Sequence, residues 1–198
     1  MSTFSAESIN SYRNDLIIGT DFRNNHLQFK TTWGLFSPKA IDEGSKLLLS
    51  HLEIEQDDDC LDMGCGYGIL GIALAKIAGK GKTLLVDKDF VAVDYAKSNA
   101  ELNGLDNCET RLSNGFSAIN KDEKFSLIVS NLPAKVGNEM LSLYLQDAYS
   151  HLKPGGRLVV VNIGGMRHFI KRGFNEIFGN YEKIKQGKIY TVSQTIRH

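Results

Sequence analysis

Residues 62–68 read DMGCGYG, and this glycine-rich stretch stands between a strand pattern and a helix pattern. The residues just before it, 59–63, have the length and apolar character of a buried strand, and residues 68–78 repeat apolar side chains at helical spacing. Glycines at such a turn let the backbone bend sharply and let a ligand approach the main-chain N–H groups. The stretch therefore predicts a ligand-binding loop at the end of a strand in an α/β protein.

The alternation of strands and helices continues to the end of the chain. Strand patterns cover residues 16–19, 26–32, 59–63, 82–87, 108–112, 125–130 and 157–162, and helical patterns cover residues 40–51, 68–78, 90–103, 137–152 and 166–178. Residues 153–156 (KPGG) are expected to break the helix before them, and residues 181–185 and 188–194 flank a Gln186-Gly187 hairpin turn.

This order predicts a single Rossmann-like α/β domain. We expect a mostly parallel seven-stranded sheet with an antiparallel last strand and helices on both faces. The division predicted from the sequence is an N-terminal extension at 1–55, with short strands, a substrate-side loop and a helix, followed by a cofactor-binding core at 56–198.

The composition is that of an ordinary globular chain. Of 198 residues, 42% are apolar and 23% charged, which excludes a disordered chain, a collagen-like chain and a disulfide scaffold. Basic and acidic residues balance at 23 each, and the net charge of zero argues against binding to nucleic acid by charge alone. The apolar stretches are too short to suggest a membrane span.

Cysteine and histidine placement bears on compartment and metal binding. Cys60, Cys65 and Cys108 form no CxxC pair, so we expect small packing residues in a reducing compartment. Residues 1–10 lack the basic start and apolar run of a signal peptide, so we expect a cytoplasmic protein. The five histidines are scattered without metal-ligand spacing, so no metal site is expected.

A carboxylate on each side of the glycines indicates the kind of ligand. Asp87 ends the next predicted strand, where it can accept hydrogen bonds from ribose hydroxyls. Residues 66–71 formally match GxGxxG, which leaves NAD possible. An acid followed by GxGxG suits S-adenosylmethionine better, because this cofactor has no pyrophosphate and carries an ammonium and a sulfonium that gain from a carboxylate such as Asp62.

Further motifs recur along nearly the whole chain: GLFS at 34–37, IDEG at 41–44, NAELNGL at 99–105 and NLP at 131–133. Together with the glycine loop and Asp87, these motifs carry a resemblance to a known family. The chain resembles class I S-adenosylmethionine-dependent methyltransferases, in particular the methyltransferase small domain family that includes ribosomal RNA small-subunit guanine-N2 methyltransferases.

The resemblance implies an S-adenosylmethionine site and a catalytic loop after the fourth strand of the core. The oxygen of Asn131 and the carbonyl of Leu132 would each accept one hydrogen of an exocyclic amino group, which turns the nitrogen lone pair toward the methyl group, and Pro133 would fix the turn. The implied cofactor-binding residues are Asp62, Gly64, Cys65, Gly66, Tyr67, Gly68, Asp87, Lys88, Asn114, Gly115, Phe116 and Asn131.

Three positions depart from the family pattern. Leu132 replaces the first proline of the usual Asn-Pro-Pro motif, and Ala134 replaces the residue that in many relatives stacks on the flipped base. Asn114 stands where relatives often have an aspartate for the adenine amino group. A stacking platform for the substrate would then come from Trp33 or Phe36.

The expected activity is N-methylation of a guanine amino group in ribosomal RNA, with RNA as the partner. Residues 166–198 carry seven basic and two acidic residues, a net charge of +5, so this end could meet phosphates or could be an ordinary solvated surface. The alternatives are a methyltransferase for a protein glutamine amide or a small molecule, an NAD-dependent oxidoreductase and a non-catalytic nucleotide-binding module. The oligomeric state stays open.

Overall fold

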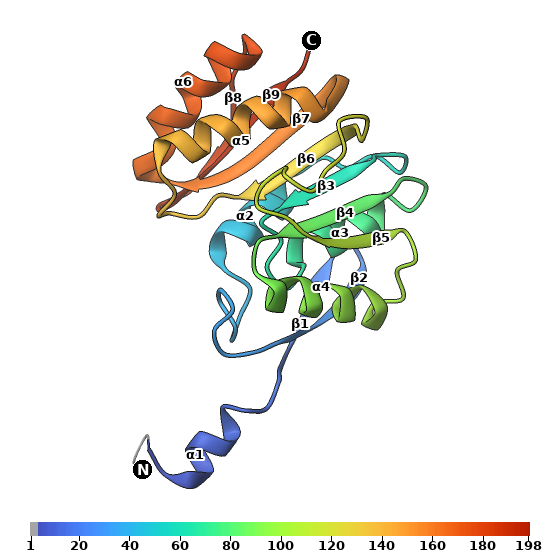
Figure 1. Ribbon diagram of the computed structural model, residues 1–198, viewed down its shortest axis with the longest axis vertical. Coiled ribbons are helices and arrows are strands. Elements are labelled where there is room, and N and C mark those ends of the chain that lie inside the picture. The colour runs from blue at the N-terminus through green and yellow to red at the C-terminus, as the bar shows by residue number, and fades with distance from the viewer. Residues whose placement is uncertain (1–3) are drawn as a thin grey trace.

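The computed structural model describes residues 4–198, so the first three residues of the expected extension lie outside it. The main sheet has seven strands, and Figure 1 shows that it is twisted and has helices on either side. The strand order is β5-β4-β3-β6-β7-β9-β8, and only the pairings of β9 with β7 and β8 are antiparallel. The strands are β3 (Cys60–Met63), β4 (Thr83–Asp87), β5 (Cys108–Leu112), β6 (Phe125–Asn131), β7 (Leu152–Ile163), β8 (Glu182–Gln186) and β9 (Tyr190–Ile196). The predicted fold class is confirmed.

Two apolar cores cover the two faces of this sheet. One face packs against α2 (Glu43–His51), α3 (Ile69–Ile77) and α4 (Phe90–Leu102), and the other against α5 (Asn138–His151) and α6 (Arg167–Phe178). Neighbouring strand residues serve opposite cores, as Cys60 and Leu61 of β3 do, because side chains alternate along a strand. In residues 4–198 no helix combines the length and apolar character that a membrane crossing requires.

An antiparallel hairpin precedes the sheet, and two asparagines of α4 hold it in place. The hairpin consists of β1 (Leu16–Phe22) and β2 (Asn25–Thr31). From α4, the Asn99 side chain accepts from the Lys30 N–H at 2.7 Å and donates to the Lys30 carbonyl at 2.8 Å. One turn later Asn103 makes the same two bonds with Gln28, at 3.0 and 2.7 Å. The two amides therefore satisfy the free edge of β2 as a neighbouring strand would.

Several predicted boundaries need correction. The helix predicted at 40–51 begins at Glu43, because the Asp42 side chain caps it by accepting from the Gly44 and Ser45 N–H groups. Residues 153–156 do not separate α5 from a later strand, since β7 starts at Leu152 and carries these residues as an irregular stretch. The closing turn contains residues 187–189 rather than only Gln186-Gly187. A short helix, α1 (Ala6–Ser11), was not predicted and projects from the body in Figure 1.

We predict that Asn99→Ala lowers the free energy of unfolding by about 3 kcal/mol, because it leaves the N–H and carbonyl of Lys30 and the buried carbonyl of Tyr67 without their partner. Asn103→Ala, at a more exposed position, should cost less than half as much. Urea unfolding of both variants measures the difference. Equal losses would show that β2 is not held mainly through Asn99.

Candidate functional site at the carboxyl edge of the sheet

The glycine loop is held by four hydrogen bonds from residues of β4 and α4. Gly64, Gly66 and Gly68 all have positive φ angles, of 75°, 54° and 99°, which residues with a Cβ rarely adopt. The Gly66 N–H donates to Asp87 Oδ2 at 2.9 Å, and Asn99 Nδ2 donates to the Tyr67 carbonyl at 2.9 Å. The N–H groups of Gly64 and Cys65 donate to the Val86 carbonyl. The loop is thus preorganised at the carboxyl ends of β3 and β4.

Asp62, the third of the four residues of β3, has one carboxylate oxygen engaged and one free. Its side chain is 1% exposed, and Oδ2 accepts from the Gly71 N–H of α3 at 2.7 Å. That bond satisfies a helix N-terminus whose N-cap, Gly68, has no side chain to do so. Oδ1 is buried and finds no partner among the described residues. Burial, opposed by the bond from Gly71 and assisted by the charge of Asp87, raises the pKa of Asp62 to about 7.

An orphaned, buried carboxylate oxygen costs free energy unless a donor meets it. A cationic ligand group such as an ammonium would supply both the donor and the compensating charge. Asp62 therefore fits the cation-binding role predicted from the sequence, and its side chain lines a small cavity with the loop.

Asp87 leaves part of its carboxylate available on the neighbouring strand. Oδ2 accepts from Gly66, Oδ1 accepts from the Asp89 N–H at 3.0 Å, and the side chain is partly exposed. Each carboxylate oxygen has further lone pairs, so ribose hydroxyls can still donate to it. Lys88 beside it is exposed.

The loop after β5 contains the other predicted cofactor residues. Asn114 is exposed, and Gly115 has a φ of 61°. Phe116 is buried in the core and stacks on His151, with ring centroids 5.2 Å apart, so its side chain serves packing. A Cβ on Gly115 would lie 2.5 Å from Cε1 of Tyr144, which places this α5 tyrosine directly over the loop.

Asn131, at the end of β6, faces the glycine loop across the cavity. Its Nδ2 donates at 3.1 Å to each oxygen of Asp42 and at 3.1 Å to Ser45 Oγ. The cavity has a volume of about 50 Å³ and is lined by Phe36, Ser45, Asp62, Gly64, Cys65, Gly66, Tyr67, Ile69, Leu70 and Asn131. The structure thus brings Asp62, the glycines and Asn131 to one place.

The residues after Asn131 explain one departure from the family pattern. Leu132 is buried, and its N–H donates to the Val161 carbonyl of β7 at 2.9 Å. A proline could not donate this bond. The Leu132 carbonyl accepts no hydrogen bond from residues 4–198, whereas Pro133 and Ala134 are exposed. The carbonyl is therefore a free acceptor beside Asn131.

The two aromatic candidates for stacking occupy different places. Phe36 is 67% exposed and lines the small cavity. Tyr67 Oη donates to the neighbouring Ser37 carbonyl at 3.4 Å, which joins the Phe36 loop to the glycine loop. Trp33 instead packs edge-on against Tyr12 and lies 4.7 Å from Lys39 Nζ, outside the lining of that cavity. The geometry favours Phe36 over Trp33.

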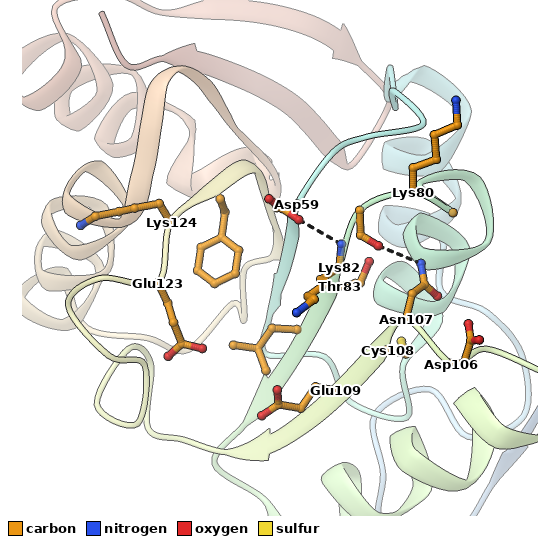
Figure 2. Close-up of a pocket in the computed structure, with 14 residues that line it drawn as sticks. Asp59, Lys80, Lys82, Thr83, Asp106, Asn107, Cys108, Glu109, Glu123 and Lys124 are labelled. Atoms are coloured by element: carbon orange, nitrogen blue, oxygen red, sulfur yellow. Dashed lines mark hydrogen bonds between the residues drawn. The ribbon is translucent and has the colours of Figure 1, made fainter.

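A much larger hollow, of about 750 Å³, lies at the opposite edge of the sheet (Figure 2). Thr83, Cys108 and Phe125, the first residues of three strands, are among its lining. Figure 2 shows two of its polar groups already paired: the Lys82 N–H with Asp59, and the Asn107 side chain with a backbone carbonyl. Ligands of doubly wound sheets bind at the carboxyl edge, so size does not make this hollow the site.

Two further groups of side chains bear on the chemistry of the site: those that could bind a metal ion and the cysteine thiols. No cluster of three histidine, cysteine or acidic side chains suited to a metal ion occurs in residues 4–198. The three cysteines are free thiols, and burial raises the pKa of Cys65 well above its ordinary value. A thiol held neutral in this way is a poor nucleophile and a poor ligand.

The strand order, the reversed β9 and the glycine loop after β3 define a Rossmann-like methyltransferase fold. A model of the methyltransferase small domain family matches residues 26–194. A structure of the T. thermophilus 16S rRNA N2 G1207 methyltransferase (RsmC), in complex with AdoMet and guanosine, superposes with a TM-score of 0.84 at 24% identity, covering 93% of this chain and 51% of that one.

Curated relatives agree with this match. Ribosomal RNA small subunit methyltransferase C of Hamiltonella defensa is 33% identical over 172 residues, which are 85% of this chain and 50% of the relative. An uncharacterized Bacillus subtilis protein, YbxB, is 34% identical over 140 residues, or 70% of each chain. The chain belongs to the methyltransferase small domain family, and it spans about half the length of the RNA methyltransferases that it matches.

Sequence reasoning missed three residues of the site: Asp42, Ser45 and Tyr144. Asp42 holds Asn131, and Tyr144 lies over Gly115 from α5. Asp42 lay within a quoted motif, but only the fold joins it to a residue 89 positions away. Tyr144 gave no signal beyond its place on a predicted helix.

We predict that Asp62 makes the protein less stable as the pH rises. Its folded-state pKa of about 7 lies above the ordinary value of 3.8, so the folded state holds a proton that the unfolded state loses first. Protonated Asp62 makes its full contribution to the free energy of unfolding below pH 4, and this contribution is lost as the pH rises to about 7. Asp62→Asn keeps an acceptor for Gly71 and removes the titration.

The free energy of unfolding should therefore gain more from Asp62→Asn at pH 8 than at pH 4, as measured by urea unfolding of both proteins across this range. Parallel pH profiles for the two proteins would contradict the burial of an ionisable Asp62.

Proposed function

We propose that this chain is an S-adenosylmethionine-dependent methyltransferase that methylates the exocyclic N2 amino group of a guanine in small-subunit ribosomal RNA, in the cytoplasm. The observation that carries the proposal is the orientation of Asn131, whose nitrogen is bound by Asp42 and Ser45 and whose Oδ1 is left as an acceptor at the cavity. The names of the RNA methyltransferase relatives support the same substrate class.

The cofactor fits the residues at the carboxyl edge. The orphaned Asp62 oxygen suits the methionine ammonium, the Asp87 carboxylate suits the ribose hydroxyls, and the backbone of the glycine loop leaves room for close approach. When bound, S-adenosylmethionine supplies a methyl group on a sulfonium, which is a good leaving group.

The catalytic loop has to orient a weak nucleophile. The lone pair of an exocyclic amino group is delocalised into the base, so the protein contributes mainly by positioning. Asn131 Oδ1 and the free Leu132 carbonyl would each accept one amino hydrogen, and the exposed ring of Phe36 would stack on the base. No strong base is needed, because the proton is lost only after the nitrogen becomes cationic.

The residues before the core supply much of the substrate side. We propose that residues up to 55 act as a substrate-side extension of the core at 56–198, because Asp42 and Ser45 from this part of the chain bind Asn131 and Phe36 lines the same cavity. Family membership favours a methyltransferase over the oxidoreductase alternative.

We predict that Asn131→Ala lowers the single-turnover rate by about 10²–10³, by analogy with loss of one preorganised polar contact, and leaves the affinity for S-adenosylhomocysteine within about twofold. The assay uses labelled cofactor with ribosomal RNA, and nucleoside analysis identifies N2-methylguanosine. Asn120→Ala, in an exposed loop before β6, serves as the control.

Parallel incubations with protein and small-molecule fractions test the other acceptors. If a protein amide is labelled and RNA is not, the substrate is a protein and the proposal of ribosomal RNA is wrong. Full activity of Asn131→Ala would remove the amino-group mechanism.

We also predict that the basic C-terminal end binds RNA phosphates. Lys171 and Arg172 are exposed on α6, and each cation lies over an aromatic ring, 5.7 Å from Tyr181 and 5.5 Å from Phe169. Lys171→Glu with Arg172→Glu should weaken RNA binding and reduce the slope of log K against log salt by about 1.4–1.8, the loss of two phosphate contacts.

Lys80→Glu with Lys97→Glu changes the net charge equally at exposed positions elsewhere. An equal weakening by both pairs, measured by fluorescence anisotropy, would show a general charge effect instead of a binding surface.

A further inference from the structure

Asp42 and Asn131 meet although they come from different parts of the chain. Both Asp42 oxygens lie 3.1 Å from Asn131 Nδ2, and Ser45 Oγ lies at the same distance. An ionised carboxylate accepts hydrogen bonds and donates none. The Asn131 amide can therefore present only its nitrogen to Asp42, and its Oδ1 must point elsewhere.

Asp42 is itself held in place by the helix that it caps. Its Oδ1 accepts from the Gly44 N–H at 2.8 Å and the Ser45 N–H at 3.2 Å, the first free donors of α2. The positive end of the helix dipole attracts a capping carboxylate. A Cβ on Gly44 would lie 2.9 Å from Asp42 Oδ1 and 3.1 Å from the Tyr190 ring, so this turn is closely packed. The Asp42 carboxylate is thus fixed in position, and it can orient the Asn131 amide.

Asp42 does not line the cavity itself. Asn131 and Ser45 do line it. Any effect of Asp42 on an acceptor molecule would therefore pass through Asn131 or Ser45.

We propose that Asp42 is a positioning residue that fixes the Asn131 amide with its oxygen toward the acceptor amino group. This inference rests on the proposed function and adds the origin of the amide orientation, which Asn131 alone does not determine. A freely rotating amide would offer its NH₂ group to the substrate part of the time, and an NH₂ group repels the amino hydrogens of a base.

Asp42→Asn separates this role from helix capping. Asparagine caps helices as well as aspartate does, so α2 should keep its start. Its own NH₂ would take the place of Oδ2 and face the NH₂ of Asn131. The Asn131 amide should then turn over, accept from residue 42 and present a donor to the cavity.

The experiment measures single turnover on ribosomal RNA with the full chain. Asp42→Asn should lower kcat at least tenfold, with the KM for RNA and the affinity for S-adenosylhomocysteine within twofold of the parent. Glu43→Gln, the same change one residue later, should leave kcat unchanged, because Glu43 only pairs with Lys46 on the surface. In an Asn131→Ala background, Asp42→Asn should cause no further loss, since the two residues act as one unit.

Two outcomes would overturn the inference while the proposed function stands: a parental kcat for Asp42→Asn when Asn131→Ala is impaired, or an independent loss in the double variant. A measurement without substrate tests the role of Asp42 separately from the proposed function. Asn131 side-chain N–H exchange, followed by NMR, should be slow in the parent and at least tenfold faster in Asp42→Ser, which keeps the helix cap. Equal exchange rates would refute the inference whether or not guanine is methylated.

Discussion

The buried carboxylate of Asp62 is the constraint on which the site depends. It lies near the end of β3, and its one engaged oxygen accepts from the Gly71 N–H in the first turn of α3. The bond fixes where the helix starts relative to the strand, and the glycines between them must then turn with positive φ angles. The second oxygen is buried and meets no donor from residues 4–198, so the site holds an unfavourable group that a cation would satisfy.

The neighbouring elements support this arrangement through amide side chains. Asn99 reaches both the β2 edge and the Tyr67 carbonyl, so the N-terminal hairpin and the glycine loop share one anchor on α4. Asn131 plays a comparable part on the other side, between Asp42 at the start of α2 and the cavity. Amides suit these places because each offers a donor and an acceptor with fixed geometry.

The family and the site together explain the departure at Leu132. A proline there would leave the Val161 carbonyl of β7 without its donor, whereas leucine continues the ladder of β6 and β7 and buries its side chain in the core on the α5 and α6 face of the sheet. With leucine at this position, its carbonyl accepts no hydrogen bond from residues 4–198. The substitution therefore changes packing and strand pairing while keeping the acceptor beside Asn131.

The sequence determined the parts of this protein that local chemistry controls. Alternating strand and helix patterns predicted the α/β class, and the acid, the glycines and Asp87 predicted a cofactor site at the carboxyl edge, because each of these signals lies within a short stretch of chain. Only the tertiary structure placed Asp42 against Asn131, set Phe36 rather than Trp33 at the cavity and brought Tyr144 over Gly115. These contacts join residues far apart in the chain, and the packing of helices on the sheet, which no local pattern records, decides which of them meet.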